Sequence, residues 1–178
     1  MAGHIIDCCS LLNLYTGWGR LLELRALKRT WYVCEAVLEE AEYTREYGAD
    51  GTAVLVPLRM SEVNRDAVLL PACIATDAEM QDYVNFACEL DDGEAQALSI
   101  AKHRGFVLLS DDRKAMSVAR RADVAVPTTS TPEVLRAWAQ LDPHNAARLV
   151  EVVRRITALA RFRPRTDSAD FQWWNACL

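Results

Sequence analysis

The chain has 178 residues, of which 51% are hydrophobic and 25% are charged, and its net charge is −5. This length suits one α/β domain with a short appendage, which can bury a core without disulfide bonds. The acidic balance argues against a general nucleic-acid-binding protein. No apolar stretch approaches the ~20 residues that cross a bilayer. His4 and Asp7 interrupt any signal-like run at the start, so we expect a cytoplasmic protein.

The cysteines and histidines do not form a pattern that is typical of a metal or catalytic site. There is no C-x-x-C pair and no zinc-like cluster among the six cysteines, which are Cys8, Cys9, Cys34, Cys73, Cys88 and Cys177. We interpret most of them as small buried hydrophobic residues in a reducing cytoplasm. The histidines suggest no acid–base pair, and we interpret them as structural.

The first half of the chain alternates apolar runs with segments of helical spacing. The apolar runs predict strands at residues 4–6, 31–33, 53–56 and 68–70, the last two in the least regular part of the sequence. Helical spacing of apolar residues appears in segments 8–17, 19–28 and 35–47. Gly48 and the turn-like pair Asp50-Gly51 end the third of these helices.

The second half continues the alternation. Helices are expected at residues 78–90, 92–104 and 113–122, followed by one that begins near Pro132 and an amphipathic helix over about 144–162. Residues 106–109 form a continuous apolar run, which is typical of a strand buried on both faces. Residues 124–126 predict another short strand, which Pro127 ends.

This alternation predicts a three-layer α/β/α fold with a central, mainly parallel sheet and a C-terminal helical extension. In such sheets, ligands bind beyond the carboxyl ends of the strands. The residues directly after each predicted strand are therefore the first candidates for a functional site.

Acidic residues occupy these positions. Asp7 follows strand 4–6, while Asp111 and Asp112 follow strand 106–109. Glu94 lies in the first turn of the helix that leads into the second of these strands, and Glu40 lies in the helix after strand 31–33. Clustered carboxylates raise one another's pKa and need a cation to stay ionised. Oxygen ligands of this kind suit Mg²⁺ or Mn²⁺.

Each acid also has a structural interpretation. Asp7 is placed to cap the following helix, and Glu94 suits the positive end of a helix dipole. Glu40 can belong to a solvated helix face, and Asp112 can be a turn residue. Taken singly, each acid favours the structural interpretation, whereas four acids at matched positions of the fold favour a site.

Four segments resemble the motifs of the PIN-domain nuclease family. Residues 6–14 resemble its opening motif, a strand followed by Asp, small residues and Leu, and residues 37–41 resemble its second motif, an apolar pair leading to a helical Glu. Residues 93–101 resemble the third motif in its Gly-Glu form, and residues 106–113 resemble the fourth. The resemblance covers about residues 4–140, and its most specific part is 91–135.

The resemblance implies a metal-dependent ribonuclease, often the toxin of a toxin–antitoxin pair of the VapC kind. It implies catalytic acids at Asp7, Glu40, Glu94 and Asp112, with Asp111 as a further ligand for Mg²⁺ or Mn²⁺. The second motif is weak, because the competing acids Glu35, Glu39 and Glu42 lie near Glu40. The sequence also has Glu94 where many members have Asp, and Ser110 where Thr is common. The partners implied are an RNA substrate and an antitoxin protein.

Other functions fit the sequence less well. A catalytically inactive PIN-like module that binds RNA or protein is the first alternative. A phosphatase of the HAD type needs a second Asp two residues after the first, where this chain has Cys9. A receiver domain needs its acidic pair near the first strand, and Asp111-Asp112 come too late.

The charge of the C-terminal segment differs from that of the rest. Residues 143–178 carry six arginines against three acidic residues, a balance of +3, so the remainder carries −8. Arg154, Arg155, Arg161, Arg163 and Arg165 form either a solvated helix face or a contact to the RNA backbone. Because the pair Trp173-Trp174 is unusual for a free tail, we expect residues 143–178 to pack on the nuclease domain (1–142) or across a homodimer interface.

Overall fold

The computed structural model describes residues 2–178, and its centre is a sheet of five parallel strands. The strands are β1 (His4–Ile6), β2 (Trp31–Cys34), β5 (Leu69–Ala72), β6 (Val107–Leu109) and β7 (Thr128–Thr129), in the order β5-β2-β1-β6-β7. His4 lies opposite Trp31 on one side and Val107 on the other. Ile5 and Ile6 of the central strand are fully buried, as expected for a parallel sheet covered on both faces.

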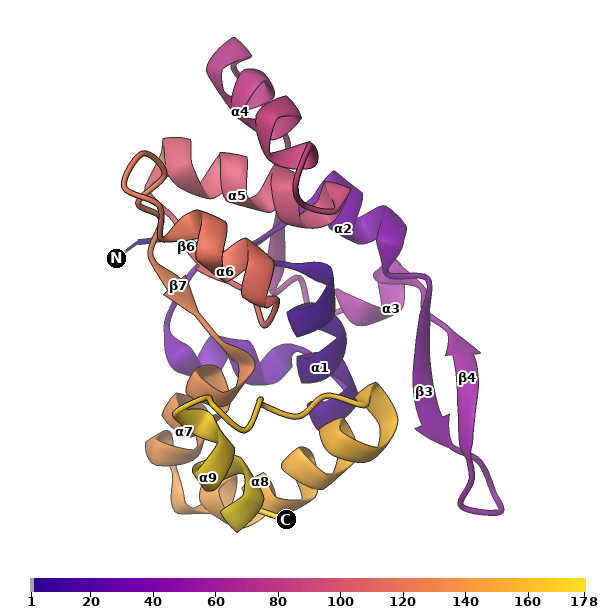
Figure 1. The fold of residues 1–178 in the computed structure, drawn as a ribbon. Coiled ribbons are helices and arrows are strands. Elements are labelled where there is room, and N and C mark those ends of the chain that lie inside the picture. The colour runs from indigo at the N-terminus through magenta and orange to yellow at the C-terminus, as the bar shows by residue number, and fades with distance from the viewer. Residues whose placement is uncertain (1) are drawn as a thin grey trace.

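Helices surround the sheet (Figure 1). They are α1 (Cys8–Trp18), the 3₁₀ helix η1 (Leu22–Leu27), α2 (Glu35–Glu40), α3 (Met60–Val63), α4 (Asp77–Ala87), α5 (Asp92–Arg104), α6 (Arg113–Ala119), α7 (Thr131–Leu141), α8 (Pro143–Arg155), the π-helical turn η2 (Ile156–Ala160) and α9 (Asp170–Ala176). Within residues 2–178, none of these helices has the length and apolar character needed to cross a membrane.

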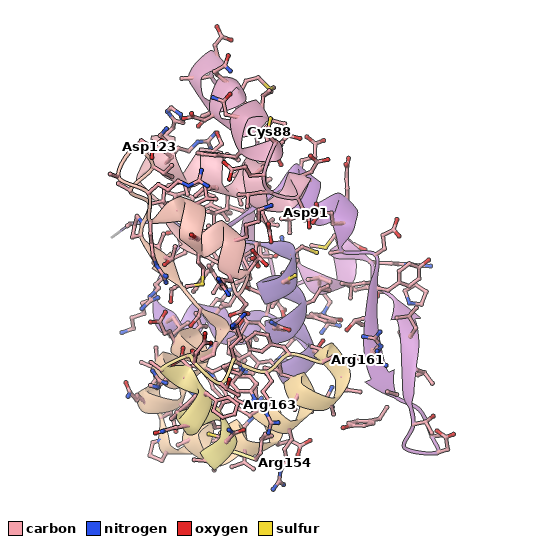
Figure 2. All side chains as sticks on the ribbon, in the orientation of Figure 1. Cys88, Asp91, Asp123, Arg154, Arg161 and Arg163 are labelled. Atoms are coloured by element: carbon pink, nitrogen blue, oxygen red, sulfur yellow. The ribbon has the colours of Figure 1, made fainter. Side chains whose placement is uncertain are left out.

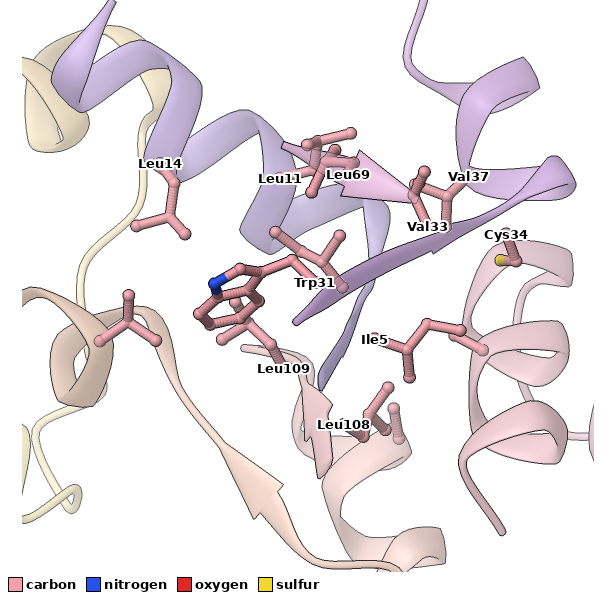
Figure 3. Close-up of a cluster of buried hydrophobic side chains, with 14 of the residues drawn as sticks. Ile5, Leu11, Leu14, Trp31, Val33, Cys34, Val37, Leu69, Leu108 and Leu109 are labelled. Atoms are coloured by element: carbon pink, nitrogen blue, oxygen red, sulfur yellow. The ribbon is translucent and has the colours of Figure 1, made fainter. Parts of the chain in front are cut away.

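The helices form two layers, one on each face of the sheet. Helix α5 packs against β1, β2 and β6, and α2, α4 and α6 pack against α5. Helices α1, α7 and α8 pack on one another in the other layer. Figure 3 shows Ile5 and Leu108 on the side of α5, whereas Trp31 lies on the side of α1. The predicted three-layer α/β/α fold is therefore confirmed.

The helix predicted over residues 35–47 is wrong in its second half. Helix α2 ends at Glu40, and β3 (Tyr43–Tyr47) pairs with β4 (Ala53–Pro57) in an antiparallel hairpin that is separate from the main sheet. Aromatic and β-branched residues favour strands, and here the paired strand outweighs the helical tendency of the preceding glutamates. The turn between the strands includes Gly51 with φ of 78°, and Asp50 Oδ1 accepts a hydrogen bond from Thr52 N.

The strand predicted at residues 124–126 is also wrong. Ala125 has a φ of 51°, which is incompatible with extended backbone. Val124 and Val126 instead belong to a turn that packs their side chains into the core, and Ala125 N donates a hydrogen bond to Arg121 O in this turn. The strand of this region, β7, begins at Thr128, beyond Pro127. The apolar pattern of residues 124–126 therefore predicted the burial of the two valines correctly, but it predicted the wrong backbone conformation.

The C-terminal segment returns across the domain. Arg161 has a φ of 57° and ends the helix formed by α8 and η2. Residues 161–169, which we call the arm, then lead to α9. Trp174 of α9 is fully buried, its Nε1 donates to Thr157 Oγ1 at 3.0 Å, and its ring meets Phe162 edge-on at 5.3 Å. These contacts hold the arm against the domain.

Candidate functional site

Three of the candidate acids lie at the carboxyl ends of two neighbouring strands. Asp7 directly follows β1, and Asp111 and Asp112 follow β6 after Ser110. Strands β1 and β6 are parallel neighbours, and Asp7 N donates to the carbonyl oxygen of Leu109 at 3.0 Å. The parallel pairing therefore brings these acids to the same edge of the sheet, which we call the acidic edge.

Asp7 is both a helix cap and a buried acid. Its Oδ1 accepts a hydrogen bond from Ser10 N at 2.7 Å, which caps α1. The residue is only 1% exposed, and its Oδ2 has no hydrogen-bond partner among residues 2–178. Burial, together with the charge of Asp111, raises the pKa of Asp7 to about 7, although hydrogen bonds from Ser110 and Ser10 act in the opposite direction. The second carboxylate oxygen is thus buried and lacks a compensating positive group.

Glu94 shares this electrostatic environment. It lies in the first turn of α5 and is half-buried. Desolvation raises its pKa to about 7, and the charges of Asp112 and Asp7 act in the same direction. Repulsion between carboxylates is significant only when they are close. Glu94, Asp7 and Asp112 therefore belong to one site, although they come from three separate segments of the chain.

Asp111 is held by hydrogen bonds from two helices. Its Oδ2 accepts from Asn13 Nδ2 at 2.9 Å and from Ser10 Oγ at 3.3 Å, both on α1. Its Oδ1 accepts from Thr131 N at 2.9 Å, at the start of α7. Burial raises the pKa of Asp111, and these donors lower it. With both oxygens engaged, Asp111 joins the end of β6 to α1 and α7.

Asp112 has a freer carboxylate. Its Oδ1 caps α6 by accepting hydrogen bonds from Lys114 N at 2.6 Å and Ala115 N at 2.9 Å. Its own backbone N donates to Ser110 Oγ at 3.1 Å. Both capping bonds fall on Oδ1, so Oδ2 lies outside the cap. Of the two adjacent acids, Asp112 is the one with the larger effect on Glu94.

Glu40 reaches the same edge from the end of α2. Its Oε1 accepts a hydrogen bond from Gly93 N at 2.8 Å, next to Glu94 in the chain. A Cβ on Gly93 would lie 2.6 Å from Glu40 Oε2, so glycine is what permits this close approach. Glu40 is exposed, and its contact satisfies a backbone donor at the start of α5.

The acids do not form a closed metal-binding group in this structure. Within residues 2–178, no three His, Cys, Asp or Glu side chains are arranged so that they hold a metal ion as they stand. Asp7, Glu40, Glu94, Asp111 and Asp112 therefore stay candidate ligands. The buried Oδ2 of Asp7 and the raised pKa of Asp7 and Glu94 nevertheless fit a divalent cation. Mg²⁺ in particular binds through one or two carboxylates and keeps several waters, so it needs no closed cage.

Sequence reasoning missed four residues of this edge. Ser10, Asn13 and Thr131 hold Asp111, and Cys9 lies among the acids. Burial raises the pKa of the Cys9 thiol to about 12, with Asp7 the largest of the charges that add to the effect, so the thiol stays protonated. The spacing of three residues between Ser10 and Asn13 was a usable signal, because it places both on one face of α1.

Comparison with known proteins gives one match. A family model described as PIN domain matches residues 4–131, which is well over half of the chain. The matched region runs from β1 to the first residue of α7 and contains all five candidate acids. No curated protein and no solved structure matches the chain.

Proposed function

Because the chain belongs to the PIN-domain family and is therefore a nuclease-type protein, we propose that it is a metal-dependent endoribonuclease that hydrolyses RNA phosphodiester bonds with Mg²⁺ or Mn²⁺. The observation that carries this proposal is the acidic edge, where Asp7 and Glu94 each have a pKa raised to about 7. Carboxyl groups whose pKa is raised by burial and by neighbouring acids are concentrated at functional sites of proteins.

Asp7, Glu94 and Asp112 are the residues that would hold the cation, with Glu40 at the margin of the site. A divalent ion at this edge would supply a water of lowered pKa and would neutralise charge on the phosphate. Asp111 acts as a positioning residue, because its hydrogen bonds fix the end of β6. Asp7 is fixed in the same way by its cap on α1, so both strand ends are rigid where the substrate phosphate would lie.

The proposal is tested with purified protein and a labelled single-stranded RNA. Cleavage should require Mg²⁺ or Mn²⁺ and stop in chelator, and Asp7→Asn and Asp112→Asn should each remove most activity. Asp123→Asn is the matched control, because Asp123 is an exposed acid outside the site (Figure 2). Cleavage that persists at the wild-type rate in Asp7→Asn would refute the assignment of the site.

A catalytically inactive module that binds RNA or protein is the second candidate. One observation favours it: residues 2–178 contain no closed group of metal ligands. Calorimetric titration with Mn²⁺ separates the two functions. An enzyme should release or absorb heat on binding Mn²⁺, and Asp7→Asn should abolish this heat. An inactive module should show no heat of Mn²⁺ binding with either the wild type or Asp7→Asn.

We further propose that the protein acts in the cytoplasm as the toxin of a toxin–antitoxin pair and forms a homodimer. All six cysteines are free thiols, which suits a reducing compartment. The β3–β4 hairpin exposes the apolar side chains of Tyr43, Tyr47, Val54 and Leu55. Strand β3 packs on α1 and η2, whereas these four side chains face solvent, so they offer an apolar surface to a partner. Light scattering tests the dimer, and co-expression with the product of the adjacent reading frame tests the antitoxin.

A further inference from the structure

The arm forms one wall of a cavity beside the acidic edge. The cavity has a volume of about 500 Å³, and Asp111 lies in its lining. The opposite wall comes from α6 and the turn into α7. Arginines line it from both sides: Arg113 at the start of α6 and Arg120 directly after its end, and Arg163 and Arg165 from the arm. In Figure 1 the arm is the extended yellow segment that leads from η2 to α9.

A second, smaller cavity lies on the other side of the arm's first residues. Its volume is about 240 Å³, and its lining includes Cys9 and Asn13 of α1 together with Arg45 and Arg161. Phe162 lines both cavities. Cys9 lies among the acids and Asn13 bonds Asp111, so the two cavities border the acidic edge from two directions.

The lining of the larger cavity contains four arginines and four acids, but in the part of the chain that the structure describes only one of these arginines, Arg165, is in an ion pair. Arg165 pairs with Asp167 at 3.0 Å, and the other arm-side acid, Asp170, pairs with Arg136 at 2.7 Å. Among residues 2–178, Arg113, Arg120 and Arg163 form no ion pair with a carboxylate. Of the other two acids in the lining, Glu133 accepts hydrogen bonds from Ser130 N and Thr129 Oγ1. Asp111 accepts hydrogen bonds from Ser10, Asn13 and Thr131.

The structure divides the C-terminal arginines into two groups. Arg154 donates a hydrogen bond to the backbone oxygen of Leu178, and Arg155 donates one to the carbonyl oxygen of Thr16. Both side chains therefore stabilise the fold. Arg161 and Arg163 are exposed on the arm, whereas Arg154 lies apart from it near the C-terminus (Figure 2). Of these four arginines, Arg161 and Arg163 are the two that are placed to meet a ligand at the acidic edge.

We propose that the arm and α6 form a groove for the backbone of single-stranded RNA, which leads the strand to the acidic edge. This inference rests on the proposed function. Arg120 and Arg163 would bind phosphates from opposite walls, and Phe162 would offer an aromatic surface for a base, as grooves for single strands commonly do. A cavity of about 500 Å³ is of the size that holds one small ligand, which suits a single nucleotide better than a duplex. The arm lies outside the matched residues 4–131, whereas α6 lies within them.

Binding is measured with a fluorescent single-stranded oligoribonucleotide in chelator, where no cleavage occurs. The test variant is Arg120→Gln with Arg163→Gln. Each phosphate contact contributes roughly 0.7 to the salt slope for single strands, so the double variant should lose about 1.4 of that slope and roughly 25-fold in affinity near 0.1 M salt. Both side chains are exposed, so the thermal melting curve should be unchanged.

The matched control is Arg121→Gln, a neighbour of Arg120 that pairs with Glu89 at 2.6 Å outside the groove. The proposal predicts wild-type binding for this control and weaker binding of a duplex than of a single strand by the wild-type protein. Equal losses in Arg120→Gln/Arg163→Gln and Arg121→Gln, or a preference for duplex, would overturn it. A protein that binds RNA in this way but never cleaves it would refute the proposed function and leave the groove intact.

Discussion

Replacing Asp7 by Asn should stabilise the metal-free protein, and by an amount that depends on pH. The pKa of Asp7 rises from 3.8 to about 7 on folding, because the carboxyl is buried. The folded chain therefore holds a proton that the unfolded chain releases, so this carboxyl weakens the folded state as pH rises from about 4 to about 7. The amide of Asn resembles the protonated carboxyl and can keep the cap on Ser10 N through its Oδ1.

The size of the effect follows from the two pKa values. A difference of about 3 in pKa corresponds to about 4 kcal/mol at roughly 1.4 kcal/mol per unit. The free energy of unfolding of Asp7→Asn should match that of the wild type near pH 4, exceed it by about 2 kcal/mol at pH 5 and exceed it by up to about 4 kcal/mol at pH 8. Urea unfolding at several pH values in chelator measures this gap.

Two further measurements make the test decisive. Asp123→Asn should show no gap at any pH, because Asp123 is exposed. Saturating Mg²⁺ should narrow the gap at pH 8, since an ion that binds only the folded wild type at 100 times its Kd adds about 2.7 kcal/mol. A gap that is the same at pH 5 and pH 8 would refute the reasoning, because it would mean that Asp7 titrates normally in the folded chain.

The other contacts of the site and the arm give three more predictions. Asn13→Ala removes a donor to the Asp111 carboxylate and should lower the free energy of unfolding at pH 8 by about 2 kcal/mol in urea titrations; an unchanged value would show that the remaining donors suffice. Gly93→Ala should stabilise the chain by about 1 kcal/mol in a Glu40→Ala background, because alanine has the higher helix propensity. In the wild type the gain should be much smaller, because the new Cβ meets the Glu40 carboxylate. A double-mutant cycle measures this difference in unfolding free energy, and additive effects would contradict the contact. Trp174→Ala should cost about 3–5 kcal/mol in the same titrations, because the indole is fully buried; a smaller loss would mean that α9 is not anchored there.

The central fold was predictable from the sequence because its signals are local. Strands β1, β2 and β6 are short apolar runs, and each is followed by a polar residue that begins the next segment. The strand at residues 124–126 and the second half of the helix at 35–47 were not predictable in the same way. Val124 and Val126 are buried in a turn, and the residues of β3 gain their strand conformation only by pairing with β4. Strand pairing overrides local propensity at β3, and burial of Val124 and Val126 from a turn overrides it at residues 124–126.

The candidate site was only partly predictable. The positions of Asp7 and Asp112 follow from the strand ends, and the place of Glu94 follows from the start of its helix. The hydrogen bonds of Asp111 join residues about 100 and 20 positions apart in the chain, so no local pattern shows them. The sequence left open whether the arginines of the arm lie near the site, because the path of the arm depends on the left-handed turn at Arg161 and on the burial of Trp174.

The structural and functional interpretations of the acids are not exclusive. Asp7 caps α1 and Asp112 caps α6, in each case through Oδ1, so the fold uses one oxygen of each carboxylate and leaves the other at the edge of the sheet. Glu40 is used in a related way at the start of α5. A helix start favours negative charge, so each cap lowers the free-energy cost of ionising the carboxylate that makes it. Burial and mutual repulsion still raise the pKa of Asp7 and Glu94, and this residual imbalance is what a cation would relieve. The carboxylates that begin the helices through Oδ1 would therefore hold the proposed metal through their other oxygens.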